Sequence, residues 1–420
     1  MRILCLLPFV PYPLNRGTNQ RIYHLVQALG TRHEVTLLMM EHAPGTKMAS
    51  SAPAEEALAA MQQIVHRVIP LKTDLQPWRS LGQRCLDLHP ETLRHWWSPD
   101  FANTLEKLLH TESFDAIYCE DICMTQYLEK LSKHAPQLLA HLPVITDRNR
   151  VDSEYQEEQS HYIKGWRARL QHHDNHLKLK RYEKKLLQQF PYQVVCSPED
   201  QHYLKTQLNG SCIQVVGNGF NAKTFQPQPW STGPVPVICF TGTMDYAPNV
   251  DAMHWFFQAI YPRLQERLPA FEVKVVGLNP LPEILEYGQL PGVEVTGGVP
   301  DIVPYYAQCD VYIAPLRIGG GTRLKLLEAM AMEKPIVTTR IAAQGLSLDP
   351  EQVFFADEAE AFAHAIVRIL SAPHKAQQKA QQAKKHVITH FTWQALGQQL
   401  CDFVAWCQHH HLRDCISASI

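Results

Sequence analysis

The alternation of strand-like and helix-like segments occurs twice in this chain, and this repetition limits the folds that it can adopt. Residues 2–10 form an apolar run typical of a buried strand, residues 18–30 have apolar side chains at helical spacing, and residues 33–40 resemble a second strand. Such a strand–helix–strand unit requires a parallel sheet with a right-handed crossover. The same alternation starts again near residue 235 and continues to residue 339. The sequence therefore predicts two α/β domains, each built on a parallel sheet.

A linker is expected between the two arrays. Residues 222–235 combine prolines, a glycine, a serine and threonines, a composition typical of loops. We therefore place a first domain at residues 1–220, a second at 221–390 and a terminal helical segment at 391–420. Two such arrays joined by a short linker leave a cleft between the domains, which is a common position for a ligand.

Some segments allow only coarser expectations. Gly30 is expected to end the first helix, because glycine commonly follows the last helical residue. Residues 43–113 predict only a helix near 53–66 and a short strand at 65–71. Residues 153–189 are strongly charged and helix-forming, and we interpret them as one or two long helices exposed to solvent.

Composition excludes several classes of protein. Hydrophobic residues make up 45% of the 420 residues and charged residues 19%, as in an ordinary globular chain. The net charge is -2 with the 22 histidines neutral, so bulk charge favours no nucleic-acid partner. The eleven cysteines are scattered without a CxxC pair, which indicates reduced thiols rather than a zinc site.

The apolar start of the chain favours a first strand over a signal peptide, because it is short and interrupted by prolines. No stretch approaches the roughly 18 uninterrupted apolar residues of a membrane span. A cytoplasmic protein is expected, and peripheral contact with a membrane surface stays open. The basic run at 178–185 is the segment that could supply such contact.

The stretch GGGTRLKLLEAMAMEKPIVTT, residues 319–339, contains a carboxylate at the border of a helical apolar face. A carboxylate in that position needs partners. One interpretation is an ordinary surface pair between Glu328 and Lys325, worth only a few tenths of a kcal/mol. The other is that Glu328 accepts hydrogen bonds from the hydroxyl groups of a ligand, each worth about 1.5–3 kcal/mol.

The residues before Glu328 favour a ligand with a diphosphate. Gly319, Gly320 and Gly321 leave the first-turn N–H groups of the helix open to close approach, and these groups carry about half a positive charge. Arg323 and Lys325 add two full charges at the same end of the helix. This combination suits a pyrophosphate group.

Other strand ends also have glycine turns. Gly17–Thr18, Asn218–Gly219 and Gly242–Thr243 occupy such positions, and each is also explained by ordinary turn chemistry. The fingerprints GxGxxG and GxxxxGK[ST] do not occur, which disfavours a dehydrogenase or an ATPase. Because no DxD motif follows a strand, we predict no required metal and no cofactor.

These motifs resemble those of a known family. Gly–Thr–Arg–Leu–Lys–Leu–Leu–Glu–Ala–Met–Ala, followed by Lys–Pro–Ile–Val, is similar to the donor-site helix of GT-B glycosyltransferases of the retaining family-4 group. VVGNGFNAKTFQP at 215–227, FTGTMDYAPNVDA at 240–252 and FTWQAL at 391–396 are similar to further parts of that family. Residues 8–29 resemble the acceptor-side loop and helix of bacterial sugar transferases in exopolysaccharide assembly. The resemblance covers nearly the whole chain and is most specific at 310–345.

The resemblance implies a fold and a set of roles. It implies two Rossmann-like domains facing across a cleft, with the acceptor on 1–220, a nucleotide sugar on 221–390 and a final helix that crosses back to the first domain. Glu328 would bind the donor ribose, Arg323 and Lys325 would hold the diphosphate, and these three residues are the catalytic candidates. The other donor-side candidates are Gly242, Thr243, Gly320, Gly321, Thr322 and Leu326, and the acceptor-side candidates are Gly17, Thr18, Asp147 and Asn149.

The implied activity is a metal-independent hexosyl-type transfer with retention. It would take a sugar from a nucleotide sugar to a hydroxyl-bearing sugar or lipid-linked acceptor in polysaccharide or glycolipid synthesis. The chain departs from the family's Glu-x7-Glu pattern, since Gly320 stands at the first position. It also lacks the usual cations in 242–252, so Arg323 and Lys325 must carry more of the phosphate charge. A nucleotide-sugar epimerase, and a nucleotide-sugar-binding scaffold without activity, stay open as alternatives.

Overall fold

The structure is a computed structural model that describes residues 1–42, 52–84, 87–160, 163, 165–228, 233–319 and 322–417. The chain divides into two compact units. Unit 1 consists of Met1–Val216 together with Leu396–Ile420, and unit 2 consists of Gly217–Ala395. The binding roles predicted for the two domains stay predictions.

Unit 1 is built on a seven-stranded parallel sheet with the strand order β3-β2-β1-β4-β5-β6-β7. Its central strands are almost wholly buried, as expected for strands of a sheet covered on both faces, and two of them end in buried charged residues, Glu120, Asp147 and Arg148. The strands are β1 Arg2–Leu7, β2 Glu34–His42, β3 Arg67–Thr73, β4 Ala116–Glu120, β5 Val144–Arg148, β6 Tyr192–Val195 and β7 Cys212–Val215.

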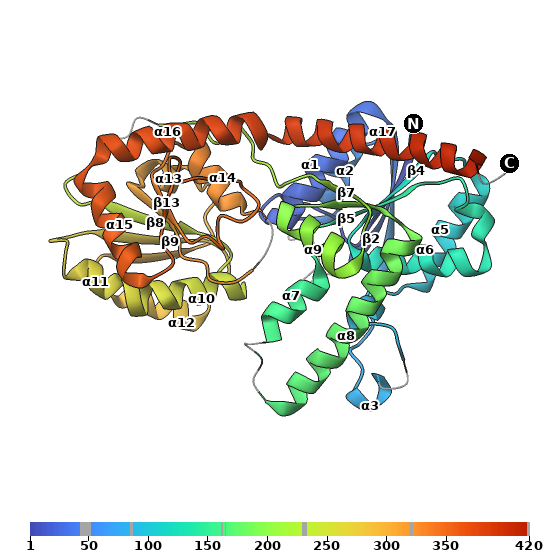
Figure 1. Cartoon of the computed structure of the whole chain (residues 1–420), viewed down its shortest axis with the longest axis horizontal. Helices are drawn as coiled ribbons and strands as arrows, with labels where there is room; N and C mark the ends of the chain where they lie inside the picture. The colour runs from blue at the N-terminus through green and yellow to red at the C-terminus, as the bar shows by residue number, and fades with distance from the viewer. Residues whose placement is uncertain are drawn as a thin grey trace. The chain divides into compact units, whose positions relative to one another are not determined.

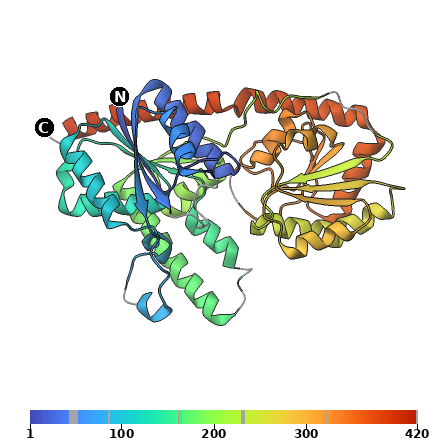
Figure 2. The ribbon, with the colours of Figure 1, turned by 180° about the vertical axis from the view of Figure 1, so that it is seen from behind.

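Helices connect these strands, and α7 and α8 stand out from the body of unit 1 as a helical pair (Figures 1 and 2). The expectation that residues 153–189 lie in solvent is wrong for part of α8, because Asn175, Lys178 and Glu183 are buried. The helices are α1 Gly17–Arg32, α2 Ala54–Gln62, α3 Leu81–Arg84, α4 Glu91–Arg94, α5 Pro99–Thr111, α6 Ile122–His134, η1 Pro136–Leu138, α7 Asp152–Gln159, α8 Trp166–Gln189 and α9 Pro198–Leu208.

Unit 2 repeats the plan with a six-stranded parallel sheet in the order β10-β9-β8-β11-β12-β13. Figure 1 shows α10, α11 and α12 on one side of this sheet and α14 and α16 on the other. The strands are β8 Val237–Thr241, β9 Glu272–Val276, β10 Val293–Gly297, β11 Val311–Ala314, β12 Ile336–Thr338 and β13 Phe354–Phe355. The helices are α10 Ala247–Trp255, η3 Phe256–Ile260, α11 Tyr261–Gln265, α12 Pro282–Leu285, η4 Glu286–Gln289, α13 Val303–Gln308, α14 Leu324–Ala331, α15 Ala359–Ser371 and α16 Pro373–His390.

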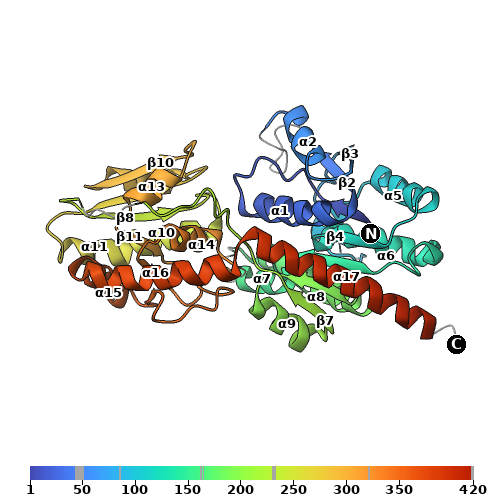
Figure 3. The ribbon, with the colours of Figure 1, turned by 90° about the horizontal axis from the view of Figure 1, so that it is seen from above.

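The last helix, α17 (Trp393–Ser417), lies beside α1 in unit 1 (Figure 3). The Cys401 thiol donates to the backbone oxygen of Ala28 at 3.5 Å, and Leu400, Val404 and Cys407 are buried. The predicted α/β class with two Rossmann-like domains is confirmed. Among the helices that the structure describes, none is long and apolar enough to cross a membrane.

Candidate functional site

Glu328 lies on α14 in unit 2, a helix whose apolar residues Leu326, Leu327 and Met330 are buried in the core. Its side chain is 9% exposed, and Oε2 accepts a hydrogen bond of 2.8 Å from the Tyr306 hydroxyl. Burial raises the pKa of Glu328 to about 7, although the bond from Tyr306 and the charge of Lys325 oppose that rise. Within the described residues, Oε1 accepts no hydrogen bond. This carboxylate therefore keeps one oxygen for a ligand.

Buried hydroxyl groups stand behind Glu328. The Tyr306 hydroxyl also lies 2.9 Å from Thr241 Oγ1, which in turn lies 2.8 Å from the Tyr312 hydroxyl. Both tyrosine side chains are fully buried, and their rings stack with centroids 5.4 Å apart. Nothing in the sequence pattern singles out these tyrosines, because a tyrosine in an apolar helix or strand usually indicates core packing.

Lys325 lies on the first turn of α14, three residues before Glu328. Its Nζ donates to Asn249 Oδ1 at 2.7 Å and lies 4.0 Å from the centre of the Phe240 ring. Desolvation and the nearby charge of Arg323 keep the pKa of Lys325 well below its usual range, while Glu328 opposes that shift. The ammonium group thus has one neutral oxygen and an aromatic face as its neighbours, and an anionic ligand would supply the missing countercharge.

The loop after β8 brings two further candidates to Lys325. Asn249 Nδ2 donates to the backbone oxygen of Thr243 at 2.8 Å, so Asn249 connects this loop to Lys325. Gly242 has a φ of +154°, and a Cβ there would lie 2.7 Å from Lys325 Nζ. The neighbouring strand end needs Gly277, where a Cβ would lie 1.7 Å from the Gly242 oxygen. The structure thus brings Gly242, Thr243 and Lys325 close together, with Asn249 in contact with both Thr243 and Lys325. Asn249 is not among the candidates predicted from the sequence.

The remaining donor-side candidates divide into three kinds. Arg323 precedes α14 and donates to the Gly319 oxygen, and the Thr322 oxygen accepts a bond of 2.8 Å from Asn218 Nδ2. Leu326 is fully buried in the core, so its side chain supports the helix. Gly320 and Gly321 lie outside the described residues.

The acceptor-side candidates lie at the carboxyl edge of the unit 1 sheet. Gly17 and Thr18 are exposed at the start of α1, and no side chain caps this helix end. Asn149 Nδ2 donates to Glu120 Oε1 at 2.9 Å. Burial, followed by the charge of Asp147, raises the pKa of Glu120 well above its usual range.

Asp147, another acceptor-side candidate, has its contacts in the interior of unit 1. It is fully buried, with Oδ1 2.6 Å from Arg21 Nη2 and Oδ2 accepting from the Tyr118 hydroxyl. Arg21 Nη1 also donates to the Val216 oxygen at 2.7 Å. The Asp147 carboxylate therefore connects α1 to β4 and β5 and holds unit 1 together.

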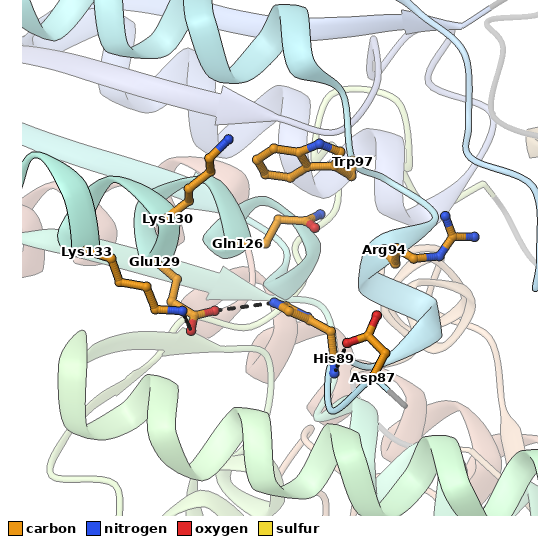
Figure 4. A pocket seen from close by; sticks show the side chains of 8 residues that line it. All are labelled: Asp87, His89, Arg94, Trp97, Gln126, Glu129, Lys130 and Lys133. Atoms are coloured by element: carbon orange, nitrogen blue, oxygen red, sulfur yellow. Dashed lines mark hydrogen bonds and ion pairs between the residues drawn. The ribbon is translucent and has the colours of Figure 1, made fainter. Parts of the chain in front are cut away.

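A pocket of about 280 Å³ lies on another part of unit 1 (Figure 4). Most of its charges are paired: Glu129 accepts from Lys133 at 3.0 Å and lies 3.6 Å from His89. We assign no role to this pocket, which contains none of the predicted site residues. Its lining consists of Asp87, His89, Arg94, Trp97, Gln126, Glu129, Lys130 and Lys133.

Metal binding receives no support from side-chain geometry. In the described parts of the chain, no group of three or more His, Cys, Asp or Glu residues is placed to hold a metal ion. The absence of a metal requirement stays a prediction.

Comparison with known proteins relates this geometry to a family. Residues 235–372, about a third of the chain, match the family described as "Glycosyl transferases group 1". The whole chain is similar to sucrose-phosphate synthase from Thermosynechococcus elongatus, with a TM-score of 0.70, 16% identity and coverage of 97% of this chain and 99% of that one. This chain has the GT-B fold and carries a glycosyl transferases group 1 domain.

Two further structures extend the comparison of the GT-B fold. A glycosyltransferase from Rickettsia africae matches with a TM-score of 0.65, 14% identity and coverage of 97% and 98%. Anabaena HepE, solved in complex with UDP-glucose, matches with a TM-score of 0.64, 16% identity and coverage of 96% and 99%. Among curated proteins, no sequence matches this one. At these identities the structural neighbours show the fold, and the group 1 domain contains Glu328, Lys325 and the loop after β8.

Proposed function

We propose that this protein transfers a sugar from a nucleoside-diphosphate sugar to a hydroxyl acceptor, with retention and without a metal ion. One observation carries the proposal: a nearly buried carboxylate, Glu328, keeps Oε1 without a partner among the described residues, within a turn of Lys325 on a helix that Arg323 precedes. A carboxylate oxygen beside two cations fits the ribose hydroxyls and the diphosphate of one ligand. The group 1 domain and a neighbour solved with UDP-glucose support this class of donor.

The proposed chemistry is mainly electrostatic. As the glycosidic bond breaks, negative charge grows on the departing diphosphate, and Arg323 and Lys325 are placed to stabilise it. Because Lys325 is desolvated before the ligand binds, the diphosphate would favour its charged form. The departing phosphate can take the acceptor proton, so the reaction needs no dedicated protein base.

For the acceptor, we propose a hydroxyl-bearing sugar or a lipid-linked sugar, and a role in polysaccharide or glycolipid synthesis. A lipid-linked acceptor would bring the protein to the cytoplasmic face of a membrane. The basic run at 178–185 offers less free charge than its sequence indicates. Lys178 pairs with Asp174 at 2.8 Å, and Lys185 pairs with Glu129 at 2.6 Å.

The first test is thermal unfolding with UDP-, GDP-, ADP-, CMP- and dTDP-linked sugars, with and without EDTA. A ligand that binds only the folded protein stabilises it by about 2.7 kcal/mol at 100 times its Kd. We expect one nucleotide class to raise the Tm equally with and without EDTA, and Glu328→Ala to abolish that increase. A folded wild-type protein that no nucleotide sugar stabilises would contradict the donor site.

Product analysis separates transfer from its alternatives. With the stabilising donor and a range of sugar acceptors, we expect a glycoside with the donor's anomeric configuration, detectable by NMR. An altered sugar formed without an acceptor would indicate an epimerase on the same fold. Binding without any product would indicate a scaffold.

A further inference from the structure

Three hydroxyl groups lead to Glu328 from inside unit 2. Tyr312 on β11, Thr241 at the end of β8 and Tyr306 on α13 follow one another at 2.8 and 2.9 Å, and Tyr306 reaches Glu328 Oε2 at 2.8 Å. Tyr306 and Tyr312 are fully buried, and Thr241 is nearly so. The series thus joins two strands and one helix to one carboxylate oxygen.

The carboxylate fixes the direction of these hydrogen bonds. An ionised carboxylate only accepts, so Tyr306 must donate its proton to Glu328. The Tyr306 oxygen then accepts from Thr241, and Thr241 accepts from Tyr312. Each hydroxyl donates toward Glu328 and polarises the next, which strengthens the last bond. The Lys325 backbone oxygen, at 3.4 Å, offers the Tyr306 hydroxyl a longer and weaker alternative.

We propose that Tyr306 is a positioning residue for donor recognition: its hydroxyl holds Glu328 Oε2 so that Oε1 is presented to the ribose hydroxyls of the nucleotide sugar. This inference rests on the proposed function. A purely structural role would require only that the buried carboxylate be satisfied. Here one oxygen is fixed by a fully buried donor and the other accepts no bond from the described residues.

The groups that face Glu328 set the sign of a pH test. Tyr306 on α13 and Lys325 on α14 both lower the pKa of Glu328, and Tyr312 on β11 lies behind Tyr306. Replacing Tyr306 by phenylalanine removes a contribution that favours the ionised form. The carboxylate then ionises at higher pH, so donor binding should begin at higher pH.

The test measures UDP-glucose binding by titration calorimetry from pH 5.5 to 8.5, because its diphosphate does not titrate in this range. We expect Tyr306→Phe to bind about 10- to 100-fold more weakly than wild type at pH 7, the loss of one hydrogen bond to a charged group. The pH midpoint of its UDP-glucose binding, at which half of the pH-dependent change in affinity has occurred, should be higher than that of the wild type. The 2′,3′-dideoxyribose analogue of UDP-glucose should bind wild type much more weakly, and Tyr306→Phe should discriminate less between the two probes.

Tyr305→Phe is the matched control, because the adjacent tyrosine packs against the core but makes no side-chain hydrogen bond to Glu328. It should behave as wild type. If Tyr306→Phe is poorly folded, Tyr312→Phe removes the first donor of the series and should shift the midpoint in the same direction by less. Unchanged affinity, midpoint and probe discrimination in the folded variants would overturn the role of Tyr306. A wild-type protein that binds neither UDP-glucose nor any other nucleotide sugar of the thermal screen would instead overturn the donor site on which that role rests.

Discussion

Asp147 in unit 1 and Glu328 in unit 2 are both buried carboxylates near the carboxyl edge of a parallel sheet, yet their surroundings differ. Asp147 is fully buried, and both of its oxygens have partners in Arg21 and Tyr118. Glu328 has one oxygen bonded to Tyr306 and the other without a partner in the described residues. A polar residue type at a strand end is therefore a weak guide to a site, whereas incomplete partnering of a buried group is a stronger one.

The largest expected effect concerns stability. Asp147→Asn leaves Arg21 buried without its countercharge, and breaking such a pair costs about 3–5 kcal/mol of unfolding free energy. Glu328→Gln at pH 8 should be neutral or stabilising, because it removes a desolvated charge. Urea unfolding of both variants measures the difference. Equal losses in the two would show that both carboxylates serve only the fold.

The second effect concerns turnover. Lys325→Met should lower kcat by about 100- to 1000-fold, the usual cost of losing one group that stabilises transition-state charge. The control is Arg317→Met, which removes an exposed cation already paired with Asp251 at 2.6 Å. Steady-state kinetics with the donor from the thermal screen should show near wild-type turnover for this control. Comparable losses in both variants would contradict a specific role for Lys325.

The third effect is a pH dependence of stability. The folded-state pKa of Glu328 is about 7, above its ordinary value near 4.5, so its contribution is fully present below pH 4.5 and is lost as the pH rises through 7. The wild type should lose on the order of 2 kcal/mol relative to Glu328→Gln across that range. Urea unfolding at pH 4.5 and pH 8 measures this difference. A difference that grows in the opposite direction would show that Glu328 is better partnered than its contacts indicate.

The smallest effect is expected at Asn249. Its side chain holds Lys325 at 2.7 Å and the Thr243 oxygen at 2.8 Å, so Asn249→Ala should free the ammonium group. Ordinary hydrogen bonds contribute about 0.5–1.5 kcal/mol, which corresponds to a loss of about 2- to 10-fold in kcat/KM. The second variant is Asn249→Asp, which can keep the oxygen that accepts from Lys325 but adds a negative charge. Comparing kcat/KM of the two variants would show whether the position of Lys325 or the charge beside it matters.

Much of the fold could be predicted from the sequence, because parallel strands buried on both faces leave long apolar runs. Gly30 shows where such prediction ends. The sequence predicts that this glycine ends the first helix, yet α1 continues to Arg32. A Cβ at Gly30 would lie 2.0 Å from the backbone oxygen of Ile64. That glycine serves a contact with a distant segment, which local pattern does not reveal.

The site was predictable to a similar extent. Glu328 and Lys325 follow from charge at a helix start, because this signal is local. Tyr306 and Asn249 come from other elements, and only the folded chain brings them to α14. The predicted solvent exposure of residues 153–189 was wrong in part for the same reason: Glu183 on α8 is buried and pairs at 2.8 Å with Arg148, which lies on β5.

Unit 1 is built from two segments that are far apart in the sequence, and this affects how it can fold during synthesis. This unit needs Leu396–Ile420, whose buried Leu400, Val404 and Cys407 belong to its interior. The ribosome makes that segment only after all of unit 2, on the order of ten seconds or more after Val216 at usual rates of synthesis. Until then the nascent unit 1 exposes the apolar surface that α17 later covers, so it is during translation that this protein most needs protection by chaperones.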